Sequence, residues 1–286
     1  MSVLLEVDNL KISARRDDDS LLPIVKGVSF NVARGEVVAL IGEAGSGKTT
    51  IALSALGYTK PGLKFVGGEV RLEGEDVITM PAEKQRALRG QRVASLAQSA
   101  AATFNPALTI GEQVTESCVL HGIMNQEQAN ERAETLYRAL ELPDPDRLGK
   151  RYPHQVSGGQ LQRAMTAMAM GCEPDVIVFD EPTTALDVTT QIEVLAAIKE
   201  AVHARGSAAI YITHDLAVVA QVADRIMVLR YGDLVEEGET RNLLSNPTEE
   251  YTKRLLAVRS LREERSEQAS GTVVLKVDGV TARYPN

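Results

Sequence analysis

Apolar runs of strand length alternate with stretches of helical spacing along most of this chain of 286 residues. Two of the runs, 36–41 and 176–181, are apolar for most of their length, which is typical of strands buried on both faces. From about 155 to 235, strand runs alternate with helical patterns, which predicts a largely parallel sheet with helices on both faces. Residues 4 to about 96 are predicted to form further strands around one helix. The pattern therefore indicates an α/β fold.

The stretch from about 98 to 154 differs from the segments on either side of it. Residues 126–140 have helical spacing, and no strand run interrupts the stretch. We therefore predict an inserted helical subdomain over about 98–154. Farther on, 242–244 and 253–256 predict closing helices. The segment 259–272 is charged and poor in apolar residues, which is typical of a linker.

The end of the chain repeats the pattern of its beginning. Residues 275–284 can be laid on residues 5–14 without a gap, and both segments predict the first strand of a domain. A repeat at the scale of a domain indicates a tandem architecture. We predict one domain over 1–258 and the start of a second over 273–286, with only its first strand present. The alternative is a C-terminal strand of independent origin, because alternation over eight residues is common.

Composition excludes some classes of function. The chain is 44% hydrophobic and 24% charged with a net charge of −8, so clustered cations for a nucleic-acid partner are not expected. No apolar stretch approaches the length of a membrane span, and the N-terminus lacks the basic region and cleavage site of a signal peptide. We expect a cytoplasmic protein that reaches the membrane only through partners.

The two cysteines, Cys118 and Cys172, are far apart in sequence and belong to no C-x-x-C pair. Separate thiols, buried or at the surface, are the default expectation for such residues. A sulfur-ligated cofactor within this chain is therefore excluded on the sequence pattern.

A glycine-rich segment follows the first buried run and fits the pattern G-x-x-x-x-G-K-S/T. Backbone N–H groups of such a turn, aimed at a helix start, form a concavity that binds phosphate. Lys48 adds a full positive charge, and the Thr49 hydroxyl is a ligand suited to Mg²⁺. The sequence thus predicts a nucleotide site. Its predicted nucleotide-binding residues are Gly42, Glu43, Ala44, Gly45, Ser46, Gly47, Lys48, Thr49 and Thr50.

Two adjacent carboxylates, Asp180 and Glu181, end the second buried run. In a phosphoanhydride hydrolase such a pair divides the work: the first holds Mg²⁺ through its water shell, and the second polarises the attacking water. Between the two runs, the segment 157–160 (Ser-Gly-Gly-Gln) precedes a stretch with helical character. Alone it would be a weak signal, because a turn has the same composition.

Together with Gln98, Asp187 and the Thr-His-Asp segment 213–215, in the expected order, these motifs resemble the nucleotide-binding domain of ABC transporters. The resemblance covers about 5–256. It implies a P-loop NTPase core with a mostly parallel sheet, an antiparallel β part in the N-terminal region and an inserted helical subdomain. Three stretches also resemble the branch that imports oligopeptides, dipeptides or nickel. They are 103–106, 151–154 and 246–252.

The resemblance implies a Mg²⁺-dependent ATPase whose active site is shared between two facing domains. ATP would lie on the phosphate loop of one domain, and the signature segment of the other would close over its γ-phosphate. The signature residues implied to bind ATP are Ser157, Gly158, Gly159 and Gln160. Asp187 would shape the interface between the two sites.

Three residues are implied to be catalytic. Glu181 would activate the attacking water, and His214 would contact the γ-phosphate. Gln98 would touch Mg²⁺ or the water and, with 102–106, carry the nucleotide state to a membrane partner. The implied metal ligands are Thr49, Gln98 and Asp180. For His214 a core histidine, and for Gln98 a plain helix start, are the alternatives.

The implied function is an energy-coupling ATPase of an uptake system for peptides or a similar small solute. Its partners would be a second nucleotide-binding domain on the same native polypeptide, two transmembrane permease subunits and, indirectly, a solute-binding protein. It would lie peripherally on the cytoplasmic face of the inner membrane. The alternatives are a soluble non-transport ABC ATPase and a non-enzymatic assembly subunit that has kept the fold.

One position departs from the family pattern. Ala14 occupies the place where relatives carry an aromatic residue that stacks on adenine, whereas the tail repeat has Tyr284. Stacking is worth on the order of 1 kcal/mol or more. We therefore predict weaker or less base-selective nucleotide binding, unless Arg15 or Arg16 covers the ring.

Overall fold

The computed structural model describes residues 2–183, 186 and 188–260. Its strands are β1 (Val3–Arg15), β2 (Leu21–Ala33), β3 (Val37–Ile41), β4 (Leu63–Leu72), β5 (Glu75–Asp76), β6 (Val93–Leu96), β7 (Val176–Asp180), β8 (Ala208–Ile212), β9 (Arg225–Arg230) and β10 (Asp233–Glu239). Its helices are α1 (Lys48–Ser54), α2 (Ala82–Leu88), α3 (Ala100–Thr103), α4 (Ile110–Leu120), α5 (Gln126–Ala139), α6 (Pro145–Leu148), the 3₁₀ helix η1 (Pro153–Gln155), α7 (Gly158–Met170), α8 (Val188–Arg205), α9 (Leu216–Val222), α10 (Thr240–Ser245) and α11 (Glu250–Ser260).

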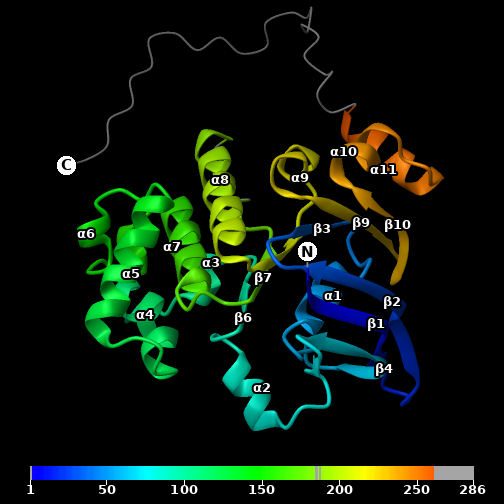
Figure 1. Cartoon of the computed structure of the whole chain (residues 1–286), viewed down its shortest axis with the longest axis horizontal. Coiled ribbons are helices and arrows are strands. Elements are labelled where there is room, and N and C mark those ends of the chain that lie inside the picture. Colours follow the sequence, from blue (N-terminus) through cyan, green and yellow to red (C-terminus); the bar gives the residue numbers. More distant parts are fainter. Residues whose placement is uncertain (1, 184–185, 187, 261–286) are drawn as a thin grey trace, which may run out of the picture.

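The strands form two sheets of different kinds. The smaller sheet is antiparallel with the order β2-β1-β4-β5, and it lies at the lower right in Figure 1. The larger sheet has the order β10-β9-β3-β8-β7-β6, and only its β10–β9 pair is antiparallel. The predicted mostly parallel sheet and the antiparallel N-terminal part are both confirmed.

Alternate residues of the larger sheet pack on opposite sides, as the pleat of a strand requires. On one face, Val38 and Leu40 of β3 join a core with α1 and the antiparallel sheet. On the other, Val37 packs with residues of α7, α8 and α9. Because both faces are covered, β3 and β8 are wholly buried and read in the sequence as apolar runs rather than alternating ones. This packing holds the strands in place, and with them the edge of the larger sheet at which the strands end and the polar residues after them lie.

Between 98 and 154 the structure has helices and no strand: α3 to α6 and the start of η1, here called the helical group. These helices lie at the left in Figure 1, away from the antiparallel sheet. Side chains of α4 and α5 share one apolar core with α7 and with Phe179 of β7. The helical group is therefore packed through α7 onto the strand that precedes the two adjacent carboxylates.

Two helices follow the last strand of the larger sheet. The predicted helices at 242–244 and 253–256 fall within α10 and α11. Since α11 runs to Ser260, helix extends into the first two residues of the predicted linker 259–272. The rest of that linker and the predicted second-domain strand at 273–286 lie outside the described residues. Among the described residues, no helix combines the length and apolar composition that a bilayer crossing requires.

Candidate active site

The phosphate loop connects β3 to α1, and two of its glycines hold conformations that other residues rarely adopt. Gly42 has φ +150°, and a Cβ there would lie 2.2 Å from the carbonyl oxygen of Leu229. Gly47 is in the left-handed region with φ +96° at the cap of α1. The loop geometry therefore depends on glycine at both positions, as the phosphate-loop pattern implies.

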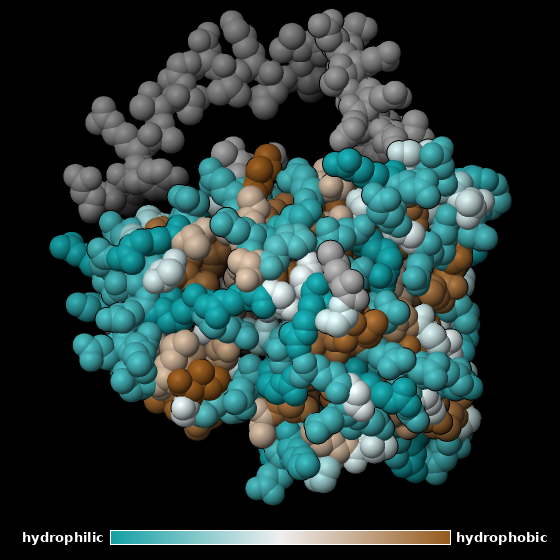
Figure 2. All heavy atoms as spheres, in the orientation of Figure 1, coloured by the Kyte–Doolittle hydropathy of each residue, from teal (hydrophilic) through white to brown (hydrophobic). Residues whose placement is uncertain are grey.

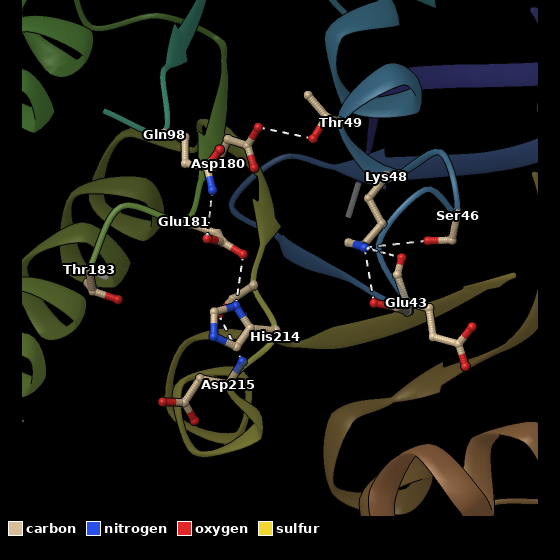
Figure 3. A network of polar contacts seen from close by, with 12 residues as sticks. Glu43, Ser46, Lys48, Thr49, Gln98, Asp180, Glu181, Thr183, His214 and Asp215 are labelled. Carbon is tan, nitrogen blue, oxygen red and sulfur yellow. Dashed lines mark hydrogen bonds and ion pairs between the residues drawn. The ribbon is translucent and has the colours of Figure 1, made fainter. Parts of the chain in front are cut away.

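Lys48, the first residue of α1, turns its ammonium group back over the loop (Figure 3). Nζ donates to the carbonyl oxygens of Gly42 at 3.0 Å and Glu43 at 2.8 Å, with Ser46 Oγ at 3.4 Å. These bonds place a full positive charge beside the backbone of the phosphate loop. Of the other predicted loop residues, Ala44 and Gly45 are exposed and Thr50 is half-buried in α1.

Thr49 and Asp180 bring two oxygen ligands together beside the loop. The Thr49 hydroxyl donates to Asp180 Oδ2 at 3.0 Å. Burial raises the pKa of the Asp180 carboxyl, while the Thr49 hydrogen bond and the Lys60 and Lys48 charges lower it in part. The neighbouring Glu181 charge raises this pKa further. A carboxylate that burial disfavours gains most from a bound cation, so this oxygen pair fits a hard divalent ion.

Glu181 is the centre of a three-residue network that joins separate parts of the chain (Figure 3). Gln98 Nε2 donates to Glu181 Oε2 at 3.1 Å, and His214 Nδ1 lies 2.8 Å from Oε1. Gln98 follows β6 and His214 follows β8, so the ends of neighbouring strands bring the three residues together. All three predicted catalytic residues therefore meet, and neither carboxylate oxygen of Glu181 lacks a polar neighbour.

The backbone at Glu181 is unusual for a residue with a side chain. Its φ is +51°, and its N–H donates to the carbonyl oxygen of Ile212 on β8 at 2.9 Å. Left-handed backbone of this kind costs of order 1 kcal/mol and is often kept at functional sites. Here it directs the carboxylate away from the strand and toward Gln98 and His214.

His214 is exposed rather than part of the core, which removes the alternative of a core histidine. Its side chain is 62% exposed, whereas that of Glu181 is 19% exposed. The next residue, Asp215, caps α9 by accepting from the backbone N–H groups of Ala217 at 2.9 Å and Val218 at 3.4 Å. This cap fixes the turn that carries His214. A helix does start directly after Gln98, with Ser99 as the N-cap of α3, but the Gln98 amide also bonds to Glu181.

The signature segment forms the start of α7 with a reciprocal cap. Ser157 Oγ accepts from Gln160 N–H at 3.2 Å, and Gln160 Oε1 accepts from Ser157 N–H at 3.1 Å. Ser157 and Gly158 are exposed, Gly159 is half-buried, and a Cβ at Gly158 would meet no atom within 4 Å. The helix start is thus open to a second molecule. Asp187 lies outside the described residues.

Two further residues reach this region that the sequence analysis did not assign to the site, although Tyr251 belongs to the stretch 246–252 that carries the resemblance to the importer branch. The Tyr251 hydroxyl of α11 accepts from the Glu43 N–H of the phosphate loop at 3.3 Å, and the Arg230 guanidinium lies 4.6 Å from the Tyr251 ring centre. Lys60 is close enough to Asp180 to lower its pKa. Tyr251 is 208 residues from Glu43. No local spacing could have linked Tyr251 to the loop.

Of Arg15 and Arg16, the two arginines on the predicted adenine side of the site, Arg15 is hydrogen-bonded within the chain. Arg15 Nε donates to Asp19 Oδ1 at 2.7 Å, across the turn between β1 and β2. Ala14 lies between Leu22 of β2 and Leu63 of β4. The weaker base selectivity expected from Ala14 stays a prediction.

Comparison with known sequences gives a consistent result. The sequence model of the family described as ABC transporter matches residues 25–184. The oligopeptide transport ATP-binding protein AppD of Bacillus subtilis is 40% identical over 257 residues, which are 90% of this chain and 78% of AppD. The peptidoglycan transport ATP-binding protein YejF of Agrobacterium fabrum is 36% identical over 283 residues, 99% of this chain and 52% of YejF.

Comparison with solved structures points the same way. The ATP-binding cassette MJ0796, solved as a dimer in a post-hydrolysis state bound to ADP and Pi, superposes with a TM-score of 0.74. It is 26% identical in sequence, and the match covers 83% of this chain and 99% of that one. The similarity thus extends over nearly all of the described residues.

Proposed function

Because this chain belongs to the ABC transporter family, and is an ATP-binding and ATP-hydrolysing subunit of it, we propose that it powers import of peptides or a similar small solute. AppD and several other relatives carry oligopeptide or dipeptide transport in their names. The observation that carries the proposed catalytic role is the network of Gln98, Glu181 and His214 beside the phosphate loop.

We propose a role in hydrolysis for each residue of the network. Water would attack the γ-phosphorus, Glu181 would accept the proton, and the bond to the leaving ADP oxygen would break. His214 would donate to a γ-phosphate oxygen, and Lys48 would neutralise charge on the β- and γ-phosphates. Gln98 would orient the water, because its amide already bonds to the carboxylate that accepts the proton.

We propose that Mg²⁺ is held by the Thr49 hydroxyl directly and by Asp180 through the ion's water shell. The donor set supports this, because a hydroxyl and a carboxylate are oxygen ligands and the remaining positions suit phosphate and water. When bound, the ion would neutralise charge on the phosphates. Gln98 would lie at the edge of its water shell.

Hydrolysis would require two cassettes to pair. Ser157 and Gly158 at the start of α7 are exposed, and their backbone N–H groups suit an anion. The dimeric form of MJ0796 supports a paired arrangement of this kind. We infer that the signature segment of one cassette closes over ATP on the other, and that Asp187 lies at their contact.

A membrane permease would dock between the larger sheet and the helical group. A cavity of about 300 Å³ lies there, lined among others by Tyr58, Arg89, Ser117 and Met168. At its rim, Gly90 lies against Ser117 and His121 at the end of α4. The neighbouring Leu120 is 77% exposed. Figure 2 shows apolar atoms gathered at the lower left, over the helical group. Exposed apolar patches are typical of contact surfaces.

The segment 102–106 would carry the nucleotide state from Gln98 to the permease. The Gln113 side chain of α4 holds this segment: its Oε1 accepts from Asn105 N–H at 2.7 Å, and its Nε2 donates to the Asn105 carbonyl oxygen at 3.1 Å. A shift at Gln98 would therefore reach α4 through a short, bonded connection.

We further propose that 273–286 begins a second ATPase domain on the same native polypeptide. The match to YejF supports this, because it takes in 99% of this chain but 52% of YejF. The second domain would then be the facing cassette. The remaining partners would be two permease subunits and, indirectly, a solute-binding protein. The permease would hold the chain on the cytoplasmic face of the inner membrane.

Capture from membranes tests the transport function. An affinity-tagged chain, expressed in its native cells and extracted in mild detergent, is expected to retain two polytopic membrane proteins. Leu120→Arg should lower their recovery about tenfold or more, because a buried charge at a contact costs at least ~1.4 kcal/mol. Leu21→Arg, at an exposed position of β2, is the matched control and should leave recovery unchanged. Recovery of ribosomes or nucleic acid without membrane proteins would instead favour the non-transport alternative.

A further inference from the structure

The two cysteines, far apart in sequence, lie in contact in the structure. Cys118 on α4 and Cys172, just beyond α7, are 54 residues apart, and their sulfur atoms are 3.3 Å from each other. Both are buried free thiols, and with Ala129 of α5 they form a small apolar cluster of their own. A disulfide has an S–S length of about 2.05 Å, so only a small approach of the sulfur atoms separates this contact from a bond.

The groups around the pair make the two thiols unequal. The Cys172 S–H donates to Cys118 Sγ. This hydrogen bond, helped by the Arg132 charge, lowers the pKa of the Cys118 thiol, whereas the same contact and burial raise the pKa of Cys172. Glu173 opposes part of the lowering at Cys118. The thiolate is the reactive form, so the lowered pKa favours Cys118 as the nucleophile.

A small cavity and an unpartnered donor accompany the pair. Arg132 Nε is buried and has no hydrogen-bond partner, although Nη2 of the same side chain lies 3.3 Å from Glu173 Oε1. Arg132 and Glu173 also line a cavity of about 20 Å³ with Met170. That volume is enough for one molecule of the size of water. Hydrogen peroxide is only slightly larger; because neither cysteine lines this cavity, a local opening beside Arg132 would be needed to bring peroxide to Cys118.

We propose that Cys118 and Cys172 form a peroxide-responsive dithiol site that closes into an intramolecular disulfide and slows ATP turnover. The Cys118 thiolate attacks one peroxide oxygen, the O–O bond breaks, and the departing hydroxide takes up a proton to become water. Cys118 is then a sulfenic acid. The Cys172 sulfur attacks the Cys118 sulfur, the S–O bond breaks, and the leaving hydroxide takes the Cys172 proton. Two thiols are oxidised by two electrons, and one peroxide is reduced to two waters.

The position of the disulfide explains why turnover would respond. It would join the end of α4 to the connection between α7 and β7, and β7 ends at Asp180. The effect on turnover rests on the function proposed above, in which two cassettes close over ATP; we infer that this closure would move the helical group relative to the larger sheet. A covalent bond between these two parts would restrict that motion.

Thiol counting on the purified, reduced full chain tests the proposal, because the chain has two cysteines. With excess hydrogen peroxide, thiols counted in denaturant are expected to fall from two to none, and the intact mass to fall by two hydrogen atoms. The rate should not depend on protein concentration. The ATPase rate should fall at least about fivefold and return with dithiothreitol.

The serine variants identify the nucleophile. Cys172→Ser should still react at Cys118 but gain oxygen in mass, and Cys118→Ser should keep its thiol under the same treatment. Persistence of both wild-type thiols, or disulfides formed only between chains, would overturn the site. A fully oxidised chain that keeps its ATPase rate would overturn the effect on turnover. Because thiols are counted independently of hydrolysis, an inactive chain would leave the thiol result readable.

Discussion

Replacing Glu181 by glutamine is expected to lower kcat for ATP hydrolysis about 10³-fold and to leave ATP affinity within about twofold, since a positioned base contributes 10²–10⁴. The amide keeps the size of the side chain and accepts from Gln98 as before, but it cannot take a proton from water. The substitution alters only the end of one side chain in the network, so the fold should not change. Single-turnover hydrolysis and nucleotide titration on the same preparation measure both quantities.

Glu193→Gln is the matched control, because Glu193 is an exposed glutamate of α8 that is not part of the network. It should hydrolyse ATP at the unmodified rate. If Glu181→Gln kept more than about a tenth of the rate, another group would have to accept the proton. His214, whose Nδ1 lies 2.8 Å from the same carboxylate, would then be the first candidate.

Replacing Lys48 by alanine is expected to weaken ATP binding about 10- to 100-fold, because hydrogen bonds to charged groups are worth about 1.5–3 kcal/mol. The ammonium group already lies over the loop, held by the carbonyl oxygens of Gly42 and Glu43. Removing the ammonium group takes a full positive charge from the site, while the backbone conformations of the loop glycines stay the same. Equilibrium titration with ATP and Mg²⁺ measures the loss.

Lys84→Ala is the control for Lys48→Ala, because it removes an exposed lysine from α2. Its ATP affinity and melting temperature should equal those of the unmodified chain. A Lys48→Ala chain that bound ATP within twofold of normal would show that backbone N–H groups alone account for phosphate binding. A large fall in its melting temperature would instead assign Lys48 to the folding of the loop.

Much of the site could be predicted because its residues follow strands at one edge of a parallel sheet. Strand order brings Gln98, Asp180 and His214 together whatever the detail of the loops, because β6, β7 and β8 are neighbours. The glycines of the phosphate loop were equally predictable, since the backbone at Gly42 admits no Cβ. The glycine pattern is local, whereas the meeting of the residues that follow β6, β7 and β8 also needs the order of these strands in the sheet.

Other features depend on contacts between distant segments and could not be predicted from spacing. Tyr251 reaches the phosphate loop only because α11 docks beside β10. That docking is supported by Glu236, whose carboxylate accepts from the Thr248 N–H at 2.7 Å and the Glu249 N–H at 3.1 Å. The contact of Cys118 with Cys172 likewise follows from the packing of α4 against α7. No sequence pattern links Tyr251 to the phosphate loop, and none links Cys118 to Cys172.

In the proposed mechanism, hydrolysis needs two paired cassettes. The most direct test is the steady-state ATPase rate per molecule of this chain, measured over a wide range of its own concentration, with Glu181→Gln as the blank. We predict a rate per molecule that rises with concentration as copies pair and that vanishes in the blank. A constant, non-zero rate per molecule down to the lowest concentration would show that one cassette completes the site alone and would contradict the claim.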